Sequence, residues 1–532
     1  MDLRQTAEGA APNTLRIANN LDLTTGGCLA SRDQIRKYAD VDATSFGLYS
    51  VGGTLHCAIP VSTTGPIALS PSGVTYDYFS NSTTGYTQTP LAVRGAEAWN
   101  RIAYIVVEKY LDPANTSLGF TYEHHYCVPI QPQSWTGTTV NGNATVTGVV
   151  PSPVALAVGS TLIVAGDVTT YRVLSTTINS ITFTTVYAGV GAAVTLTSYS
   201  PSNTKVSLPF SPGKSLFLLT QKMWSNDTLT NDVWYSSSIN GPTDWVNSED
   251  AGFIPVSKHS PSDQTVRGFG SYGNQLCIYF IDSIQIWNVS VDPADFSIFD
   301  IIGGAGTEQN GSIVNVMGNP MYFAKGGFRN LDVVAVTGQS NDADVGANIY
   351  PLTRTLDLTG KKLVAIWSPS RARYMCAIGD QVYVYTNSPN ANIQGWTTYT
   401  LPSGHNVTDM VEIDGSIFYR SGSSIYTFDS AFTGEVGFAW QARFPYLMAG
   451  AYGYRKGWYS YECAQQGTQT LTIYPDPRNE SIVYSGPTIS GSTYGINHIP
   501  LAIVAESISP VMSGVGTWKM DNFTFRIKVG NS

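Results

Sequence analysis

The sequence predicts an all-β fold: a β-propeller of about six blades, with an inserted small β-barrel or sandwich and a C-terminal β-sandwich. Three observations lead to this prediction. Charged residues are only 13% of the 532, while Gly (51), Tyr (31) and Pro (28) are plentiful, a composition that disfavours long helices. A hairpin pattern with glycine turns recurs along the chain. A nearly uncharged segment interrupts that pattern.

The recurring pattern consists of an apolar entry, a tight polar turn that contains glycine, and an alternating strand that leaves the turn. The Gly-Gly, Gly-Asn, Gly-Asp and Asp-Gly pairs supply the positive φ angles that two-residue hairpins need. We therefore expect one hairpin in each of five segments. These are "YSVGGTLHCAI" (Tyr49–Ile59), "GSYGNQLCIYF" (Gly270–Phe280), "NVMGNPMYFAK" (Asn315–Lys325), "CAIGDQVYVYT" (Cys376–Thr386) and "VEIDGSIFYRS" (Val411–Ser421).

The spacing of these turns favours a propeller over a sandwich. The glycines at Gly273, Gly318, Gly379 and Gly415 are 36 to 61 residues apart, which brackets the length of one four-stranded blade. The alternative is an unspecified all-β protein, because any such protein has hairpins every few dozen residues. Two further strand pairs, which bring the count to about six blades, are expected at "RIAYIVVEKYL" (Arg101–Leu111) and "KSLFLLTQKMW" (Lys214–Trp224).

A segment of different character separates the early hairpins from the later ones. Between Gln131 and Thr204 the only charged residues are Asp167 and Arg172, and short β-branched strands alternate with small polar turns. This pattern predicts a small independent β-barrel or sandwich. The expected parts are 1–130 (N-terminal segment and first blades), 131–204 (inserted domain), 205–437 (remaining blades) and 438–532 (C-terminal β-sandwich).

The C-terminal prediction rests on a change of pattern after Asp429, where the hairpin repeat stops. Gln469–Pro477 and Trp518–Val529 alternate cleanly between apolar and polar residues, as the strands of a β-sandwich do. Helical signals are few. Ser31–Val41 predicts a short helix, and a second is expected to start around Ala96 and to continue as a strand.

Charge and hydropathy exclude several classes of function. The 38 acidic and 29 basic residues give a net charge of −9, which disfavours a surface that grips nucleic acid by neutralising phosphates. The N-terminus lacks the apolar core of an export signal, and no stretch of about 18 uncharged apolar residues occurs. We therefore expect a soluble chain without a membrane segment.

The cysteines predict neither a zinc site nor a disulfide framework. They are far apart and form no Cys-x-x-Cys pair, so we expect reduced and mostly buried thiols. The six are Cys28, Cys57, Cys127, Cys277, Cys376 and Cys463.

The densest group of potential metal ligands is "EHHYC". On a strand, Glu123, His125 and Cys127 share one face, while His124 and Tyr126 share the other. Three ligands on one strand face span about 13 Å, too far for one tetrahedral ion unless the strand bends. No second His or Cys cluster completes the set, so we expect a structural histidine pair.

The sequence matches a sialidase propeller only in part. Ser238, Asn240 and Trp245 match the Asp-box of sialidase propellers, but Pro242 and Asp244 replace its Gly and Thr. A sialidase also needs three converging arginines and a Tyr-Glu nucleophile pair. The candidate arginines are Arg267, Arg329, Arg354, Arg371 and Arg373.

Nucleotide and acyl-transfer chemistry lack their motifs as well. The sequence has no phosphate-binding Gly-x-x-x-x-Gly-Lys-Ser/Thr loop, and "GPTISGSTYG" lacks the strand-turn-helix context of a nucleophilic serine. The sequence therefore predicts a non-enzyme with no catalytic, cofactor-binding or metal-binding residues. Trp234 and Trp245 are expected to pack within a blade, with Asp244 capping backbone amides of the turn between them.

Five segments in chain order carry a resemblance to a known family. "VWYSSSINGPTDW" (Val233–Trp245) is the best local match, an aromatic strand and a polar Pro turn that closes on Asp-Trp. "NNLDLTTGGCLASRDQIRKYADV" (Asn19–Val41) resembles the family's opening strand and Gly pair, but it lacks the Arg-Pro-Gly that commonly follows them in the family. The others are Gly311–Leu331, Arg373–Tyr399 and Gly422–Asp429. Together these segments resemble the nozzle proteins of short-tailed bacteriophages, the propeller-based tail hubs that include tail tubular protein B.

The resemblance implies a structural virion protein of the tail, assembled in the host bacterial cytoplasm. It implies a homo-hexameric ring at the distal end of the head-to-tail channel, through which DNA is ejected without sequence-specific binding. Adaptor proteins above and tail fibres or spikes at the side are the implied partners. Six copies at −9 carry roughly −54, and an acidic lumen lets DNA slide. The alternatives are a propeller glycosidase and a host-surface adhesion module.

Overall fold

The computed structural model confirms an all-β chain, and its helices are short. The α-helix α2 (Tyr350–Thr353) is one turn long, and no helix in the described residues is long and apolar enough to span a bilayer. The 3-10 turns are η1 (Thr116–Leu118), η2 (Pro153–Ala155), η3 (Val256–His259), η4 (Pro293–Asp295), η5 (Asn310–Ser312) and η6 (Ala347–Ile349). The structure describes residues 15–529 except 25–27, 62–69, 81–90, 100–101, 113–114, 128–133, 157–160, 166, 168–169, 200–202, 260–264, 332–344, 389–392 and 450–452.

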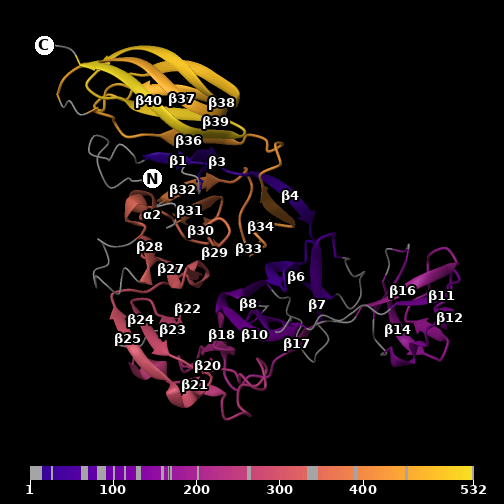
Figure 1. Cartoon of the computed structure of the whole chain (residues 1–532). Helices are drawn as coiled ribbons and strands as arrows, with labels where there is room; N and C mark the ends of the chain where they lie inside the picture. Colours follow the sequence, from indigo (N-terminus) through magenta and orange to yellow (C-terminus); the bar gives the residue numbers. More distant parts are fainter. Residues whose placement is uncertain are drawn as a thin grey trace.

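Seven blades are arranged in a ring and form the propeller (Figure 1); six are separate small sheets, and the seventh, β29 to β32, is one end of a larger sheet that continues into the C-terminal domain. The first four blades are β5 (Phe46–Val51), β6 (Thr54–Val61) and β7 (Val74–Ser80); β8 (Ala92–Trp99), β9 (Ile102–Tyr110), β10 (Phe120–Cys127) and β17 (Asn203–Lys205); β18 (Pro212–Leu219), β19 (Lys222–Asp227), β20 (Val233–Tyr235) and β21 (Gly252–Ile254); and β22 (Gly268–Tyr272), β23 (Gln275–Tyr279), β24 (Ser283–Asn288) and β25 (Ser297–Gly303). The last three are β26 (Val314–Val316), β27 (Asn319–Ala324) and β28 (Gly327–Asn330); β29 (Leu363–Ser368), β30 (Arg373–Ile378), β31 (Gln381–Ser388) and β32 (Ile393–Thr400); and β33 (Asp409–Ile413), β34 (Ser416–Ser421), β35 (Ser424–Asp429) and β4 (Gln34–Asp40).

The innermost strand of each blade contacts the innermost strands of both neighbouring blades. The contacts run from β5 through β8, β18, β22, β26, β29 and β33 and back to β5, which closes the ring. The seven segments singled out in the sequence each lie in a different blade. The described blades are therefore one more than the predicted six.

The five expected hairpins are all present, with the backbone that their turn residues favour. Gly52 and Gly53 have φ of 58° and 81°, and Gly273 and Gly379 have φ of 58° and 68°. These angles lie in the region that glycine adopts without steric cost. Turn chemistry thus sets the position of each hairpin.

Two expected helices are strands in the structure. The segment around Ala96 lies in β8, which pairs with β9, and β9 is one strand of a four-stranded blade rather than a strand pair. Ser31–Val41 contains β4, which pairs with β35 and completes the last blade of the propeller. Strand β8 pairs with the next strand of the chain and β4 with a strand almost 400 residues later, and in both segments sheet pairing outweighs local helix propensity.

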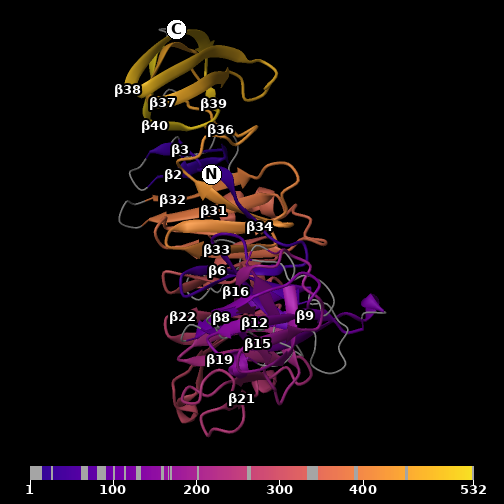
Figure 2. The same ribbon diagram turned by 90° about the vertical axis from the view of Figure 1, so that its right-hand side faces the viewer.

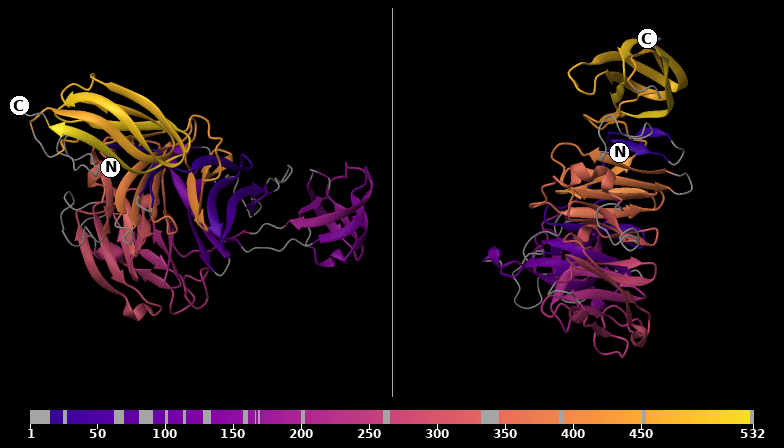
Figure 3. Two further views of the ribbon diagram at one scale, coloured as in Figure 1. Left: turned by 45° about the horizontal axis from the view of Figure 1, so that its top comes forward. Right: turned by 90° about the vertical axis from the view of Figure 1, so that its left-hand side faces the viewer.

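The inserted domain is a closed six-stranded barrel, as expected. Its order is β11 (Ser134–Thr138), β12 (Thr145–Val150), β15 (Ser180–Phe183), β14 (Thr170–Thr176), β13 (Thr161–Val164) and β16 (Ala193–Tyr199). It has its own buried core, which includes Trp135, Leu162 and Phe183. The barrel interrupts one blade between β10 and β17 and projects away from the propeller (Figure 3).

The C-terminal domain is a strongly curved sheet at one end of the molecule (Figure 2). Its strands are β1 (Ile17–Asn19), β2 (Leu21–Leu23), β3 (Leu29–Ser31), β36 (Ala439–Arg443), β37 (Lys456–Tyr474), β38 (Tyr484–Ala505), β39 (Ser509–Val515) and β40 (Trp518–Val529). The first part of β37 pairs with β40 and its last part with β39, so the sheet is continuous around one core.

The N-terminal segment connects this domain to the propeller. Residues 1–130 were expected to hold an N-terminal segment and the first blades, but strands β1 to β3 of that range belong to the sheet of the C-terminal domain. Strand β1 lies between β36 and β32 of a blade, and β2 and β3 extend the C-terminal sheet through β40. Arg32, 1% exposed, forms a bidentate ion pair with Glu435, with N–O distances of 2.7 and 2.9 Å. Asp22 pairs with Arg373 at 2.8 Å. Buried charge therefore joins the N-terminal segment to the propeller and to the chain that leads into the C-terminal domain.

Candidate functional site

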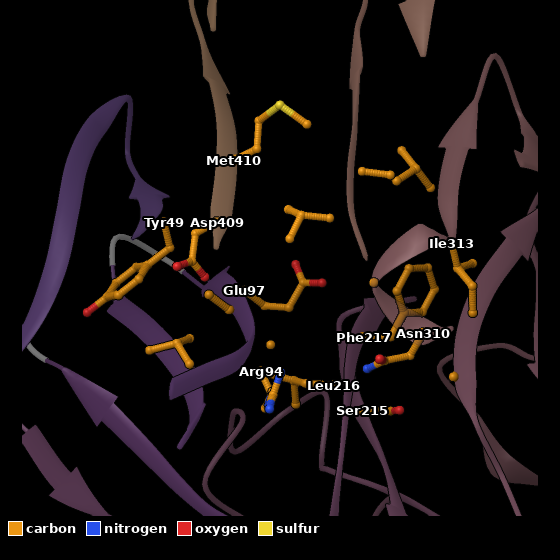
Figure 4. A pocket seen from close by; sticks show the side chains of 18 of the residues that line it. Tyr49, Arg94, Glu97, Ser215, Leu216, Phe217, Asn310, Ile313, Asp409 and Met410 are labelled. Atoms are coloured by element: carbon orange, nitrogen blue, oxygen red, sulfur yellow. The ribbon is translucent and has the colours of Figure 1, made fainter. Parts of the chain in front are cut away.

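The candidate site is a cavity of about 500 Å³ at the centre of the propeller (Figure 4). Residues from the innermost strands of all seven blades line it, and it is open to solvent rather than sealed. Its wall is largely apolar, with Leu216, Phe217 and Ile313 among the lining residues. Cavities of this size with a few convergent polar groups are the usual form of small-molecule sites.

Glycines on the inner strand β8 and in the turn η5 allow neighbouring blades to approach one another closely around this cavity. A Cβ atom at Gly95 would lie 2.9 Å from Cβ of Leu216 on the next blade. A Cβ atom at Gly311 would lie 2.2 Å from the backbone oxygen of Leu363. Both distances are below van der Waals contact, so side chains at these positions would push the blades apart.

Both basic residues of the lining are neutralised by carboxylates. Arg94 donates two hydrogen bonds to Glu108, at 2.7 Å from Nε and 2.6 Å from Nη2. Lys362 lies 3.0 Å from Oδ1 of Asp409. Neither cation is available as a counterion for the remaining acidic residue of the lining.

That residue is Glu97, on the innermost strand β8. Its carboxylate points into the cavity (Figure 4), and the backbone N–H of Leu218 donates a hydrogen bond to it. No ion pair to Glu97 occurs among the described residues. Although the cavity is open to solvent, burial of the carboxylate among the inner strands raises the pKa of Glu97 from the usual 4.5 to about 7, despite the Leu218 hydrogen bond.

The structure does not assemble the arginine triad of a sialidase in this cavity. None of the five candidate arginines is among the lining residues, where the arginine is Arg94. Arg371 and Arg373 instead pair with Asp33 and Asp22 of the N-terminal segment. Sequence reasoning missed Glu97 and Arg94, because the expected helix around Ala96 hid their place on an inner strand.

The "EHHYC" segment is strand β10, and its faces alternate as expected. On one face Glu123 lies 3.3 Å from His125 and 2.7 Å from both Lys109 and Lys205. Burial alone would raise the pKa of Glu123, but the hydrogen bonds from these three residues outweigh it and hold that pKa well below its usual range. No group of potential ligands that could hold a metal occurs in the described part of the chain.

His124 lies on the opposite face of β10 and is fully buried. Its Nδ1 is 3.0 Å from the Tyr104 hydroxyl and its Nε2 is 3.2 Å from the Ser225 hydroxyl, while its ring contacts Trp245. Burial lowers the pKa of His124 to about 3, so the ring is neutral at physiological pH. Its surroundings are those of a structural histidine.

The tryptophans of the Val233–Trp245 segment pack within and beside their blade. Trp245 is 1% exposed, and Trp234 stacks on Phe210 with ring centroids 5.0 Å apart. Asp244 accepts hydrogen bonds from the backbone amides of Val246 and Asn247, so it caps the turn that follows Trp245 and not, as expected, the turn between the two tryptophans. This arrangement is scaffold rather than a platform for a sugar.

A second carboxylate, which the sequence did not reveal, organises the serine triplet of this segment. Asp250 accepts hydrogen bonds from the hydroxyls of Ser237 and Ser238 and from the Ser238 amide, each at 2.7 Å, and its Oδ2 lies 3.2 Å from Lys222. Burial alone would raise the pKa of Asp250, but these hydrogen bonds outweigh it and lower that pKa.

All six cysteines are free and five are buried, as expected.

Neither a protein-family model nor a curated protein sequence matches the chain. Among solved structures, the chain is similar to BamB from Moraxella catarrhalis at 9% identity over 74% of this chain and 97% of that one, with a TM-score of 0.32. It is similar to the Pan2 WD40 domain of Neurospora crassa at 9% identity over 63% and 89%, with a TM-score of 0.29. Likeness at this level says nothing about ligands or partners.

Proposed function

We propose that the chain is a structural, non-enzymatic virion protein that forms a homo-hexameric ring, the distal nozzle of a bacteriophage tail, through which DNA is ejected. The observation that carries the proposal is the placement of the five resembling segments. Val233–Trp245 holds β20 and its turn, Gly311–Leu331 holds β26 to β28, Arg373–Tyr399 holds β30 to β32, and Gly422–Asp429 holds β35. The likeness thus falls on strands of four different blades in chain order.

The N-terminal segment supports the same proposal. Asn19–Val41 contains β2, β3 and β4, which connect the C-terminal sheet to the propeller. A channel wall must keep its shape while DNA passes, and ion pairs such as that of Arg32 and Glu435 hold the two parts together. The net charge of −9 disfavours adhesion of DNA to such a wall.

Electron microscopy of purified virions tests this proposal. The chain is expected in a six-fold ring at the distal end of the tail, and light scattering of the isolated assembly is expected to give about 344 kDa, six times 57.3 kDa. Absence of the chain from particles would reject the proposal. A stable monomer in solution, with no ring in virions, would also reject it.

The barrel surface favours adhesion as a second candidate function. At the end of the barrel opposite its two connections to the blade, Val140, Val186 and Val190 are 54%, 58% and 82% exposed. Exposed aliphatic residues grouped on a nearly uncharged domain are typical of a contact surface. Deleting about residues 131–203 and measuring host adsorption and particle assembly tests this role, and no change in either would exclude it.

A further inference from the structure

The central cavity contains a charge imbalance that the fold itself does not resolve. Arg94 and Lys362 are each paired with a carboxylate, Glu108 and Asp409, so their charges cancel locally. Glu97 adds one further carboxylate to the same cavity. An ionised carboxylate removed from water is costly unless a cation accompanies it.

Hydrogen bonds from the protein stabilise the Glu97 carboxylate only in part. The carboxylate of Glu97 can accept several hydrogen bonds, and the Leu218 amide donates one of them. Tyr49, which also lines the cavity, directs its hydroxyl to Asp77 at 2.6 Å, and Ser215 donates to the backbone oxygen of Arg267 at 3.0 Å. These neighbours are therefore engaged elsewhere.

The remaining wall is suited to an apolar body beside the carboxylate. Leu216, Phe217, Ile313, Val364 and Val411 contribute to the lining. A volume of about 500 Å³ lies within the range of small-molecule sites and exceeds what a single hydrated ion needs. The combination of one uncompensated anion and apolar walls fits a ligand with one cationic group and a short hydrocarbon chain.

We propose that the propeller cavity binds a small organic cation, an ammonium or guanidinium group on a short apolar chain, with Glu97 as its counterion. The cationic group takes the place beside the Glu97 carboxylate, and the chain lies against the apolar wall. This site is within one subunit and does not depend on the proposed tail function.

Calorimetric titration of the full-length protein with butylammonium tests the proposal, with 1-butanol as the neutral analogue. Butylammonium is expected to bind at pH 8 at millimolar concentrations, and 1-butanol is expected not to bind. Because an ammonium ion requires the ionised carboxylate, affinity is expected to fall about tenfold between pH 8 and pH 6. The wild-type protein alone thus gives a result for or against the proposal.

Two variants assign the binding to Glu97. Glu97→Gln is expected to abolish binding of butylammonium, whereas Glu249→Gln, which removes an exposed carboxylate outside the cavity, is expected to leave it unchanged. Circular dichroism confirms that each variant is folded. Equal binding of butylammonium and 1-butanol, binding retained in Glu97→Gln, tighter binding of calcium than of butylammonium, or no binding at pH 8 would each overturn the proposal.

Discussion

Glu97 is expected to make stability depend on pH in the opposite direction to most carboxylates. Its folded-state pKa of about 7 exceeds the usual 4.5, so between these values the folded chain binds more protons than the unfolded chain. Its contribution to stability is therefore full below pH 4.5 and is lost as the pH rises through 7. At pH 8 the carboxylate of Glu97 is mostly ionised in the folded chain and therefore destabilises the folded state.

The variant Glu97→Gln tests this directly by urea unfolding. At pH 8 the variant is expected to be more stable than the wild type by up to about 3 kcal/mol, because one pKa unit corresponds to about 1.4 kcal/mol. Near pH 4.5 the two are expected to be equal. Glu249→Gln, at an exposed position, is the control and should show no such crossover. A Glu97→Gln variant less stable at both pH values would contradict the assignment.

His124 is expected to have the reverse effect. Burial holds the pKa of His124 at about 3, below the usual 6.5. Between these two values the unfolded chain binds a proton at this residue and the folded chain does not, so stability falls as the pH drops below 6.5. His124→Gln keeps a donor and an acceptor for Tyr104 and Ser225 but does not titrate. We expect the variant to lose about 1 to 3 kcal/mol at pH 8 and to show a smaller further loss between pH 6.5 and pH 4. An unchanged acid dependence, measured by urea unfolding, would exclude this role for His124.

At the scale of elements, the spacing between the turn η5 and the inner strand β29 of the next blade depends on glycine. Gly311→Ala would place a Cβ atom 2.2 Å from the backbone oxygen of Leu363, and a backbone atom cannot move aside alone. We expect a loss of about 1 to 3 kcal/mol, as overpacking in a core usually costs. Gly303→Ala is the matched control, because a Cβ there meets no atom within 4 Å. Thermal unfolding should separate the two variants, and equal melting temperatures would show that the blades have room to move.

The elements that the sequence predicted correctly are those specified by local chemistry. Each of the five glycine turns lies in a hairpin, since positive φ angles are a property of the turn residues themselves. Of the two segments wrongly predicted as helices, the one around Ala96 pairs with the adjacent β9, whereas the other depends on a distant partner. Strand β4 forms because β35, almost 400 residues later, provides its hydrogen bonds, and nothing in Ser31–Val41 reveals that partner.

The candidate site was not predictable for the same reason. Its lining comes from seven strands between Leu48 and Val411, and no local motif marks any of them. Glu97 lacks a counterion because Arg94 and Lys362 are paired with other carboxylates, and these pairs form only in the folded chain. The structural roles of Trp245 and of the buried cysteines were predictable, since residue type and spacing alone favour burial.

At the scale of the whole molecule, the junction between the propeller and the C-terminal domain rests on buried charge. Replacing Arg32 by methionine leaves the Glu435 carboxylate without its cation, although the Ile35 amide still donates to it. Breaking a buried ion pair on one side typically costs about 3 to 5 kcal/mol. We expect the variant to unfold at lower urea concentration, and the double variant Arg32→Met with Glu435→Leu to recover part of the loss. A double variant no more stable than Arg32→Met would contradict this account.

The barrel, in contrast, is expected to be removable without loss of the propeller. The chain leaves the blade at Cys127 and returns at Asn203, and these two residues are partners in the pairing of β10 with β17. An Asn-Gly turn in place of residues 128–202 would therefore close a hairpin in the existing register. The barrel core is made of its own residues, so residues 134–199 alone should also fold. We expect the shortened chain to keep the melting temperature of the propeller in calorimetry and the isolated barrel to give a separate cooperative transition, because neither unit contributes to the core of the other. A shortened chain that aggregates, or a barrel without a transition, would show instead that the two fold as one unit.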